Sequence, residues 1–125
     1  THGSVRTDDL RPAIVRVRAA AGQLGGFAVA ELGSAVDAAL SRRPWGIVVD
    51  LRPLDEITPA GLAMLMRLAA AAGELDVGLI LVCSAVVRSA LADAGLTENF
   101  ELSHDLDTAL ATLGVVVRRL PGTRR

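Results

Sequence analysis

The chain has 125 residues, of which 51% are hydrophobic and only 2% aromatic, and its formal net charge is −1. This length and apolar content predict one folded domain with a substantial core and exclude disorder along the whole chain. The near-neutral charge and the scarcity of aromatic rings argue against a nucleic-acid partner, which needs a basic surface or stacking platforms.

All 13 basic residues are arginines, so the chain contains no lysine. This excludes P-loop phosphate binding, Schiff-base chemistry and the lysine of a receiver domain. The single Cys83 cannot form an internal disulfide, which suits a reducing compartment, and we expect a cytoplasmic protein. Because no apolar run approaches the ~20 residues of a membrane span and no signal-peptide pattern is present, we expect no membrane insertion.

Strand and helix patterns alternate from the start of the chain. Residues 13–19 alternate polar and apolar side chains, which predicts a half-buried strand near a sheet edge. Residues 4–7 predict a short strand paired with it across Asp8 and Asp9. A loop at residues 22–26 then leads to a helix over residues 27–41, whose inward residues are Val29, Leu32, Val36, Ala39 and Leu40.

The middle of the chain predicts a buried strand, a loop and a helix. Pro44 precedes an apolar strand at residues 47–51, and residues 52–58 form the loop. The helix is predicted over residues 59–72, with a turn at Gly73. Its core-facing side chains, at the i, i+3, i+4, i+7 spacing, are Leu62, Leu65, Met66 and Ala69.

The continuous apolar run at residues 77–83 is typical of a central strand covered on both faces. A helix over residues 85–94 is predicted next, ending at Gly95 as its cap. Its buried residues are expected to be Val87, Ala90, Leu91 and Ala94.

A short strand at residues 100–102 precedes the last predicted helix. Ser103 or Asp105 is expected to cap that helix, which carries Leu106, Ala109, Leu110 and Leu113 on its apolar face. These repeated units predict an α/β fold, a mostly parallel or mixed central sheet of about four to five strands with about four helices.

The chain is thus divided into residues 1–12, an N-terminal segment with a short strand and a vector-derived remnant, a domain at 13–113 and a basic tail at 114–125. The tail holds Arg118, Arg119, Arg124 and Arg125 and no acid. Two alternatives stay open: a solvated, frayed end, or a segment at residues 115–117 that adds an edge strand or docks on an acidic neighbour. A homodimer formed through this tail or the first strand also stays open.

The stretch GIVVDLRPLDEITPAGLAMLMRL, residues 46–68, carries the most informative pattern. It resembles the signature of the STAS domain family, the fold of bacterial anti-sigma factor antagonists, in which a strand ending Asp-Leu leads to Asp-Ser-Ser-Gly at the next helix. Aligned without a gap, Thr58 falls on the family's aspartate and Pro59 on the serine that the partner kinase phosphorylates. Ala60 falls on the second serine and Gly61 on the glycine, so the phosphorylatable residue is missing.

Two further steps support the resemblance, which covers about residues 13–113. Gly22-Gln23-Leu24-Gly25 is similar to the family's Gly-Glu-Leu-Asp, with Gly25 in place of the acid. Residues 91–96, LADAGL, are similar to the end of the family's third helix.

The resemblance implies a protein-binding transcription regulator of the bacterial cytoplasm and not an enzyme, without catalytic residues, cofactor or metal. The implied partner is an anti-sigma factor of the kinase-like ATPase type, from which a sigma factor is displaced. The partner-binding residues are expected to be Asp55, Glu56, Thr58, Pro59, Ala60, Gly61, Leu62 and Arg88. The alternative role is an accessory subunit of a lipid-transport ABC system or a module that senses a small ligand.

The residues of this site also have structural interpretations. Thr58 at the N-cap and Pro59 at the first helical position are typical of a helix start, and a less favoured alternative makes Thr58 a displaced phosphate acceptor. Asp55 and Glu56 are interpreted either as solvated loop carboxylates or as the acidic lip of an interface.

Other candidates are weaker. Asp50 ends a strand where open α/β sheets often bind ligands, but a hydrogen-bonded structural role is favoured. The glycine loop fails the dinucleotide fingerprint at Leu24 and Phe27. Cys83 has no base nearby in sequence and is expected to be buried. Ser84 is expected to cap the third predicted helix, and Ser89 to face a partner groove.

Overall fold

The computed structural model describes residues 5–11 and 14–119. The strands are β1 (Arg6–Arg11), β2 (Ile14–Arg18), β3 (Gly22–Leu24), β4 (Gly46–Asp50), β5 (Leu54–Ile57), β6 (Gly78–Val82) and β7 (Glu101–Ser103). The helices are α1 (Phe27–Ser41), α2 (Pro59–Glu74), α3 (Ala85–Asp93) and α4 (Leu106–Arg119), with a 3-10 turn, η1, at Thr97–Asn99.

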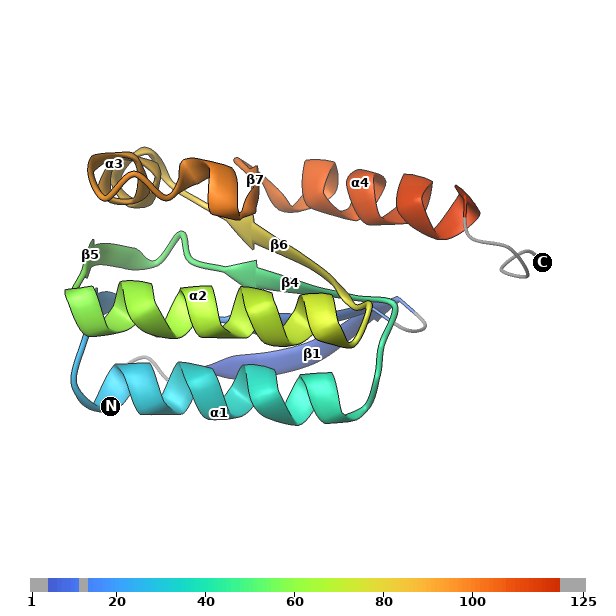
Figure 1. The fold of residues 1–125 in the computed structure, drawn as a ribbon, viewed down its shortest axis with the longest axis horizontal. Helices are drawn as coiled ribbons and strands as arrows, with labels where there is room; N and C mark the ends of the chain where they lie inside the picture. Colours follow the sequence, from blue (N-terminus) through green and yellow to red (C-terminus); the bar gives the residue numbers. More distant parts are fainter. Residues whose placement is uncertain (1–4, 12–13, 120–125) are drawn as a thin grey trace.

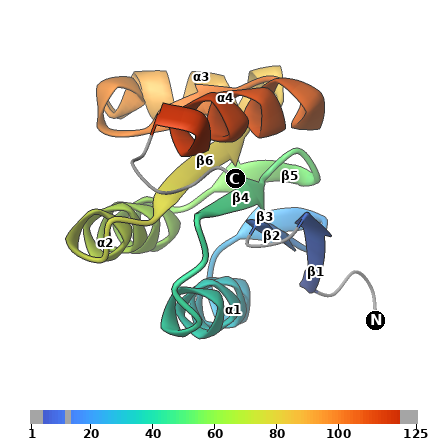
Figure 2. The same ribbon diagram turned by 90° about the vertical axis from the view of Figure 1, so that its right-hand side faces the viewer.

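The main sheet has the order β1-β2-β4-β6-β7, with β1 antiparallel to β2 and every other pair parallel. β3 and β5 form a separate parallel pair beyond the carboxyl ends of the central strands. Figures 1 and 2 show the sheet between two helical layers, α1 and α2 on one side and α3 and α4 on the other. The predicted α/β fold with a mixed sheet is therefore confirmed.

The core follows from the two-residue alternation of the central strands. On the face under α1 and α2, β4 contributes Ile47 and Val49 to the larger core cluster. On the opposite face, Val48 joins the cluster formed with α4. The continuous apolar run of β4 is therefore explained by burial on both faces.

α4 lies close to the amino ends of β4 and β6. A Cβ atom added to Gly46 or Gly78 would come within 2.7 or 2.9 Å of Leu113. The two glycines therefore leave the space that the Leu113 side chain fills. At the start of α4, the Asp105 carboxylate accepts a hydrogen bond from the Thr108 N–H at 2.7 Å, so Asp105 is the cap and Ser103 is not.

The expected turn at Asp8 and Asp9 is wrong, because β1 continues through both residues to Arg11. Asp8 lies opposite Arg16 in the antiparallel register, and Arg16 donates two hydrogen bonds to its carboxylate, at 3.1 and 2.8 Å. This pair belongs to a strand ladder and not to a turn. Residues 1–4 and 12–13, which include the expected remnant, lie outside the described residues.

The two predicted loops at residues 22–26 and 52–58 are also partly wrong. Gly22–Leu24 and Leu54–Ile57 pair as parallel strands, and the Gly22 N–H donates to the Pro53 carbonyl. Both segments are short and show no regular alternation of polar and apolar residues, so neither carries a strand pattern of its own.

α2 is rotated relative to the predicted face and is longer. Its buried residues are Gly61, Met64, Leu65, Leu68 and Ala72, and it passes the expected turn at Gly73 to end at Glu74. Met66 is 41% exposed, and with Ala69 it lines a shallow hollow of about 310 Å³ beside Asn99. The cause is a stretch that is apolar almost all round, which defines no single inward face.

The remaining elements agree with the sequence apart from their ends and from Ala94, which was expected to be buried but is exposed, because it follows the last turn of α3 as its C-cap. α3 ends one residue before the expected Ala94, and Gly95 has the positive φ of +73° that a helix-ending glycine adopts. α4 continues to Arg119, so the alternative of an edge strand at residues 115–117, which the sequence left open, is wrong. Residues 120–125 of the basic tail lie outside the described part.

Candidate functional site

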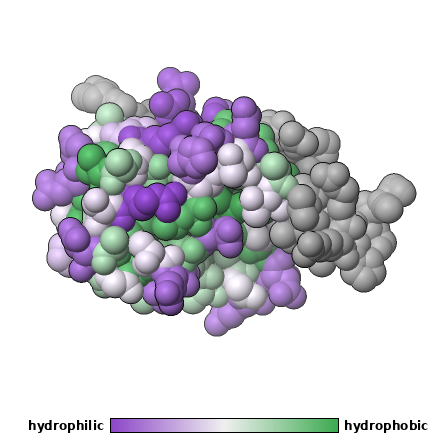
Figure 3. All heavy atoms as spheres, turned by 90° about the horizontal axis from the view of Figure 1, so that it is seen from above, coloured by the Kyte–Doolittle hydropathy of each residue, from purple (hydrophilic) through white to green (hydrophobic). Residues whose placement is uncertain are grey.

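The predicted partner-binding residues gather at one end of the molecule, with Arg88 facing away from the others. The N-termini of α1 and α2 lie there beside β5 and α3, whereas α4 ends at the opposite side (Figure 1). The face formed by α3 and α4 carries apolar side chains along its middle, between hydrophilic ones (Figure 3).

Thr58 fixes the start of α2 to β3. Its N–H and its hydroxyl both donate to the Leu24 carbonyl, at 3.0 and 2.9 Å. The hydroxyl oxygen also accepts the Gly61 N–H at 3.1 Å, which is the N-cap hydrogen bond. The Thr58 hydroxyl therefore uses its proton and a lone pair within the fold.

Two glycines allow this close approach. A Cβ atom at Gly61 would lie 2.7 Å from the Leu24 carbonyl oxygen, and one at Gly25 would lie 2.6 Å from the Thr58 methyl group. Gly61 is buried, so its place in the family pattern has a packing reason here. Gly25 leaves the space that the Thr58 side chain occupies.

The contacts of Thr58 and Gly61 with Leu24 are called the Leu24 clamp. The exposed surface around this clamp is small and mostly apolar. Pro59 and Ala60, the first two residues of α2, are exposed, and Leu62 is half-buried. Phe27, the first residue of α1, is 79% exposed. Phe27 was not among the predicted partner-binding residues, although an aromatic residue at a helix start directly after Gly25-Gly26 was the available signal.

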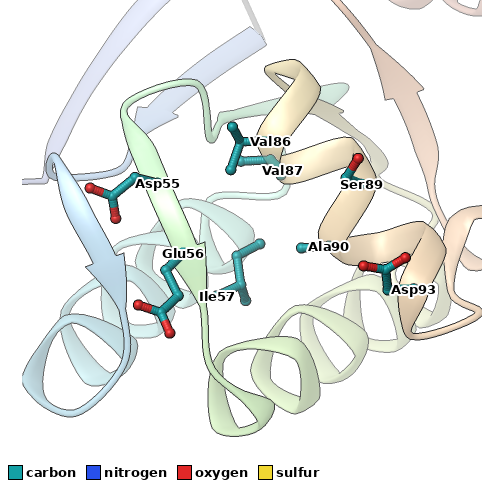
Figure 4. A pocket seen from close by; sticks show the side chains of 8 residues that line it. All are labelled: Asp55, Glu56, Ile57, Val86, Val87, Ser89, Ala90 and Asp93. Carbon is teal, nitrogen blue, oxygen red and sulfur yellow. The ribbon is translucent and has the colours of Figure 1, made fainter.

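A hollow of about 230 Å³ separates β5 from α3 (Figure 4). It is lined by Asp55, Glu56 and Ile57 of β5 and by Val86, Val87, Ser89, Ala90 and Asp93 of α3. We call it the β5–α3 groove. Asp55 and Glu56 are exposed but lie on a strand, so their interpretation as loop residues is wrong.

Ser89 lines the groove, whereas Arg88 does not. At 100° per residue, Arg88 lies on the opposite side of α3 from the line of Val86, Ser89 and Asp93. Arg88 therefore does not share the groove with Ser89, and its expected role in partner binding stays a prediction.

Asp50 is a structural carboxylate. Its side chain is 0% exposed and accepts hydrogen bonds from the Arg52 side chain at 2.9 and 2.9 Å and from the Arg52 N–H at 3.1 Å. Burial by itself raises the pKa of Asp50, but the hydrogen bonds from Arg52 and the nearby charges of Arg52 and Arg18 outweigh it and hold the pKa below its usual value. Asp50 therefore stays charged and engaged within the fold.

The remaining candidates have structural roles. Burial raises the pKa of the Cys83 thiol to about 11, so at neutral pH it carries its proton and is a poor nucleophile. The Ser84 hydroxyl accepts the Val87 N–H at 3.2 Å as the cap of α3.

Within residues 5–11 and 14–119 no three His, Cys, Asp or Glu side chains are grouped as metal ligands. In the same ranges no helix combines the length and apolar character that crossing a membrane requires.

No family model and no curated protein matches this chain, but solved structures do. An anti-sigma factor antagonist from Mycobacterium paratuberculosis is 24% identical with a TM-score of 0.73, covering 89% of this chain and 93% of that one. The phosphorylated form of the Bacillus cell fate determinant SpoIIAA is 15% identical with a TM-score of 0.67, covering 88% and 99%. A sulfate transporter family protein from Wolinella succinogenes is 16% identical with a TM-score of 0.69, covering 89% and 93%. The chain has the STAS fold of these antagonists.

The packing of Gly61 predicts opposite effects of one substitution at two positions of α2. Gly61→Ala is expected to lower the free energy of unfolding by about 1–3 kcal/mol, because the added methyl group meets a backbone carbonyl that cannot rotate away. Gly73→Ala has open space around its Cβ and is expected to raise it by about 0.5–1 kcal/mol. Urea unfolding followed by circular dichroism measures both, and an equal gain in the two variants contradicts the clamp geometry.

The Asp50–Arg52 pair predicts a pH-dependent stability. Asp50→Asn is expected to lower the free energy of unfolding by about 1–3 kcal/mol at pH 7, because a charged hydrogen-bond acceptor is lost. Since the folded pKa lies below the unfolded value near 3.9, this stabilisation is complete above about pH 5 and disappears as the pH falls through the folded pKa.

We therefore expect urea unfolding to give the same difference in unfolding free energy between wild type and variant from about pH 7 to about pH 5. The difference becomes smaller as the pH falls toward about 3. Asp37→Asn is the matched control, because its pair with Arg67 is exposed and contributes less than about 1 kcal/mol. A difference that widens in acid contradicts this account of Asp50.

Proposed function

We propose that this chain is a protein-binding regulator of transcription in the bacterial cytoplasm that acts as an anti-sigma factor antagonist. The observation that carries the proposal is a fold shared over 89% of the chain with the mycobacterial antagonist. In this proposal the chain binds an anti-sigma factor and displaces the sigma factor that it holds. The partner belongs to the kinase-like ATPase type.

The proposed docking surface is the end of the molecule at which α1 and α2 begin. Pro59, Ala60 and Phe27 offer exposed apolar contact, and Asp55 and Glu56 lie beside them on β5. Thr58 and Gly61 act indirectly, because the Thr58 hydroxyl and the Gly61 N–H hold the start of α2 on β3. The surface is therefore rigid before the partner arrives, which lowers the entropy cost of binding.

The proposed regulator has no serine switch at the usual position. Pro59 has no hydroxyl group, and the Thr58 hydroxyl already donates to Leu24 and accepts from Gly61. Phosphoryl transfer requires a hydroxyl placed in line with the γ-phosphate, and the capping hydrogen bonds hold the Thr58 oxygen elsewhere. Abundance, and not phosphorylation, then controls how much partner is captured.

This role involves no catalysis by the chain. Cys83, with its raised pKa, is not activated, and the Ser84 hydroxyl caps a helix. Within the described residues the Asp50 carboxylate is occupied by Arg52. A nucleophile with a positioned base, which covalent catalysis requires, is not formed by these groups.

A second candidate function is favoured by the likeness to the sulfate transporter family protein from Wolinella succinogenes. In that case the chain is an accessory subunit that binds a transporter, of the lipid-transport ABC type in our sequence-based expectation. Co-purification with a transporter ATPase, and not with an anti-sigma factor, distinguishes this function from the first.

Affinity capture from a lysate of the source organism, with and without ATP, tests the proposal. We expect mass spectrometry to identify a kinase-like anti-sigma factor that ATP does not release. Ala60→Arg, at the exposed start of α2, is expected to abolish this capture, whereas Ala38→Arg, exposed near the other end of α1, leaves it unchanged. Recovery of a transporter ATPase, or equal capture by both variants, contradicts the proposal.

The loss of the switch predicts a gain of phosphorylation on restoring the serine. With the captured kinase and ATP, wild type is expected to gain no phosphate, and Pro59→Ser is expected to gain one, because the new hydroxyl lies at the family's phosphorylated position. Intact-mass spectrometry and phosphopeptide mapping measure both. A phosphate on Thr58 of the wild type contradicts the proposed regulation.

A further inference from the structure

The β5–α3 groove combines an apolar floor with an acidic rim. Ile57 points from β5 toward α3, where Val87 is buried and Ala90 half-buried, whereas Asp55 and Glu56 lean to the other side of β5 (Figure 4). Asp93 stands on the α3 side. Val86, at the rim, is 53% exposed, so apolar surface beside the hollow remains open to a partner.

The rim carries three acids without a counter-charge. Within the described residues, none of Asp55, Glu56 and Asp93 forms an ion pair, while Asp8, Asp37 and Asp50 each do. Arg88, the arginine of α3, lies on the helix side away from the groove. The charge of this region is therefore negative on both banks of an apolar hollow.

We propose that the β5–α3 groove binds a basic amphipathic segment of the partner protein. One apolar side chain of that segment enters the hollow against Ile57 and Ala90. Arginine or lysine residues of that segment contact Asp93 on the α3 side, and others reach across β5 to Asp55 and Glu56. This inference rests on the proposed function, because the groove adjoins the end of the molecule at which that partner docks.

Charge complementarity and size select this occupant. A hollow of about 230 Å³ is smaller than the roughly 300–1,000 Å³ of typical small-molecule sites and suits a single side chain. The three carboxylates are not grouped as metal ligands within the described residues, so the acidic rim is not a cation cage. Long basic side chains lay apolar stems on such a floor and keep their charges at the rim.

The described part of α4 lies away from the groove. α4 ends at Arg119, on the side of the molecule opposite α3 and β5 (Figure 1). The described part of this helix therefore does not supply the occupant, which in this proposal is a segment of the partner protein.

Nuclear magnetic resonance titration of the full chain tests the groove. The probe is a short acetylated peptide in which pairs of arginines alternate with pairs of leucines. In the control peptide each arginine is replaced by glutamate. We expect the arginine peptide, and not the glutamate peptide, to shift the amide signals of Ile57, Val86 and Ala90. The affinity is expected to fall with added salt, because the contacts are exposed ion pairs.

Charge-neutral variants assign the effect to the rim. Each exposed pair contributes up to about fivefold in affinity, so the triple variant Asp55→Asn/Glu56→Gln/Asp93→Asn is expected to bind the peptide roughly tenfold more weakly. The matched control Glu31→Gln/Glu74→Gln/Asp76→Asn removes the same charge from α1 and the end of α2 and is expected to bind like wild type.

Several outcomes overturn the inference. These are no shift at millimolar peptide, shifts centred elsewhere, and equal weakening in both triple variants. If the amide signals of the groove residues shift with protein concentration in the absence of peptide, a second copy of the chain occupies the groove. That result also overturns the inference. If wild type and the groove variant capture an anti-sigma factor equally, the groove proposal is wrong and the proposed function stands. If no anti-sigma factor is captured but the peptide binds as expected, the proposed function alone is wrong.

Discussion

The carbonyl oxygen of Leu24 is the point on which the functional end of this molecule depends. It accepts both the N–H and the hydroxyl of Thr58, and Gly61 approaches it closely enough that no side chain fits between. These contacts join β3, the start of α2 and the connection to α1. Each buried hydrogen bond contributes about 1 kcal/mol net, so these contacts add little to the total stability. Their main effect is to fix the relative positions of the three elements.

Much of the fold was predictable because its determinants are local or strongly periodic. The limits of α1 were predicted at Phe27 and Ser41, since Gly25-Gly26 and Pro44 bracket a clear apolar stripe. Thr58 and Ser84 were predicted as caps, and Asp105 as one of two candidates with Ser103, because a short oxygen-bearing side chain at a helix start satisfies free N–H groups. β4 and β6 were recognisable as runs buried on both faces.

The failures share a different cause, since they depend on contacts distant in sequence. β3 and β5 are held by pairing with each other, and neither Gly22–Leu24 nor Leu54–Ile57 carries a strand pattern alone. The face of α2 was misassigned because packing, and not periodicity, chooses among its apolar sides. At the site, the sequence identified the start of α2 and Ser89 as a groove residue. It did not identify the rest of the groove lining, because the groove forms only when α3 lies beside β5.

Leu113 packs against Gly46 and Gly78 and thereby fixes the position of α4 at one end of the domain. It places the later half of α4 over the amino ends of β4 and β6, while Thr58 lies beyond their carboxyl ends. The 16 residues of α2 alone span ~24 Å between these ends. A fluorophore, a surface tether or a fused domain joined after Arg119 would thus leave the opposite end unobstructed, and one molecule can be immobilised and engaged at the same time.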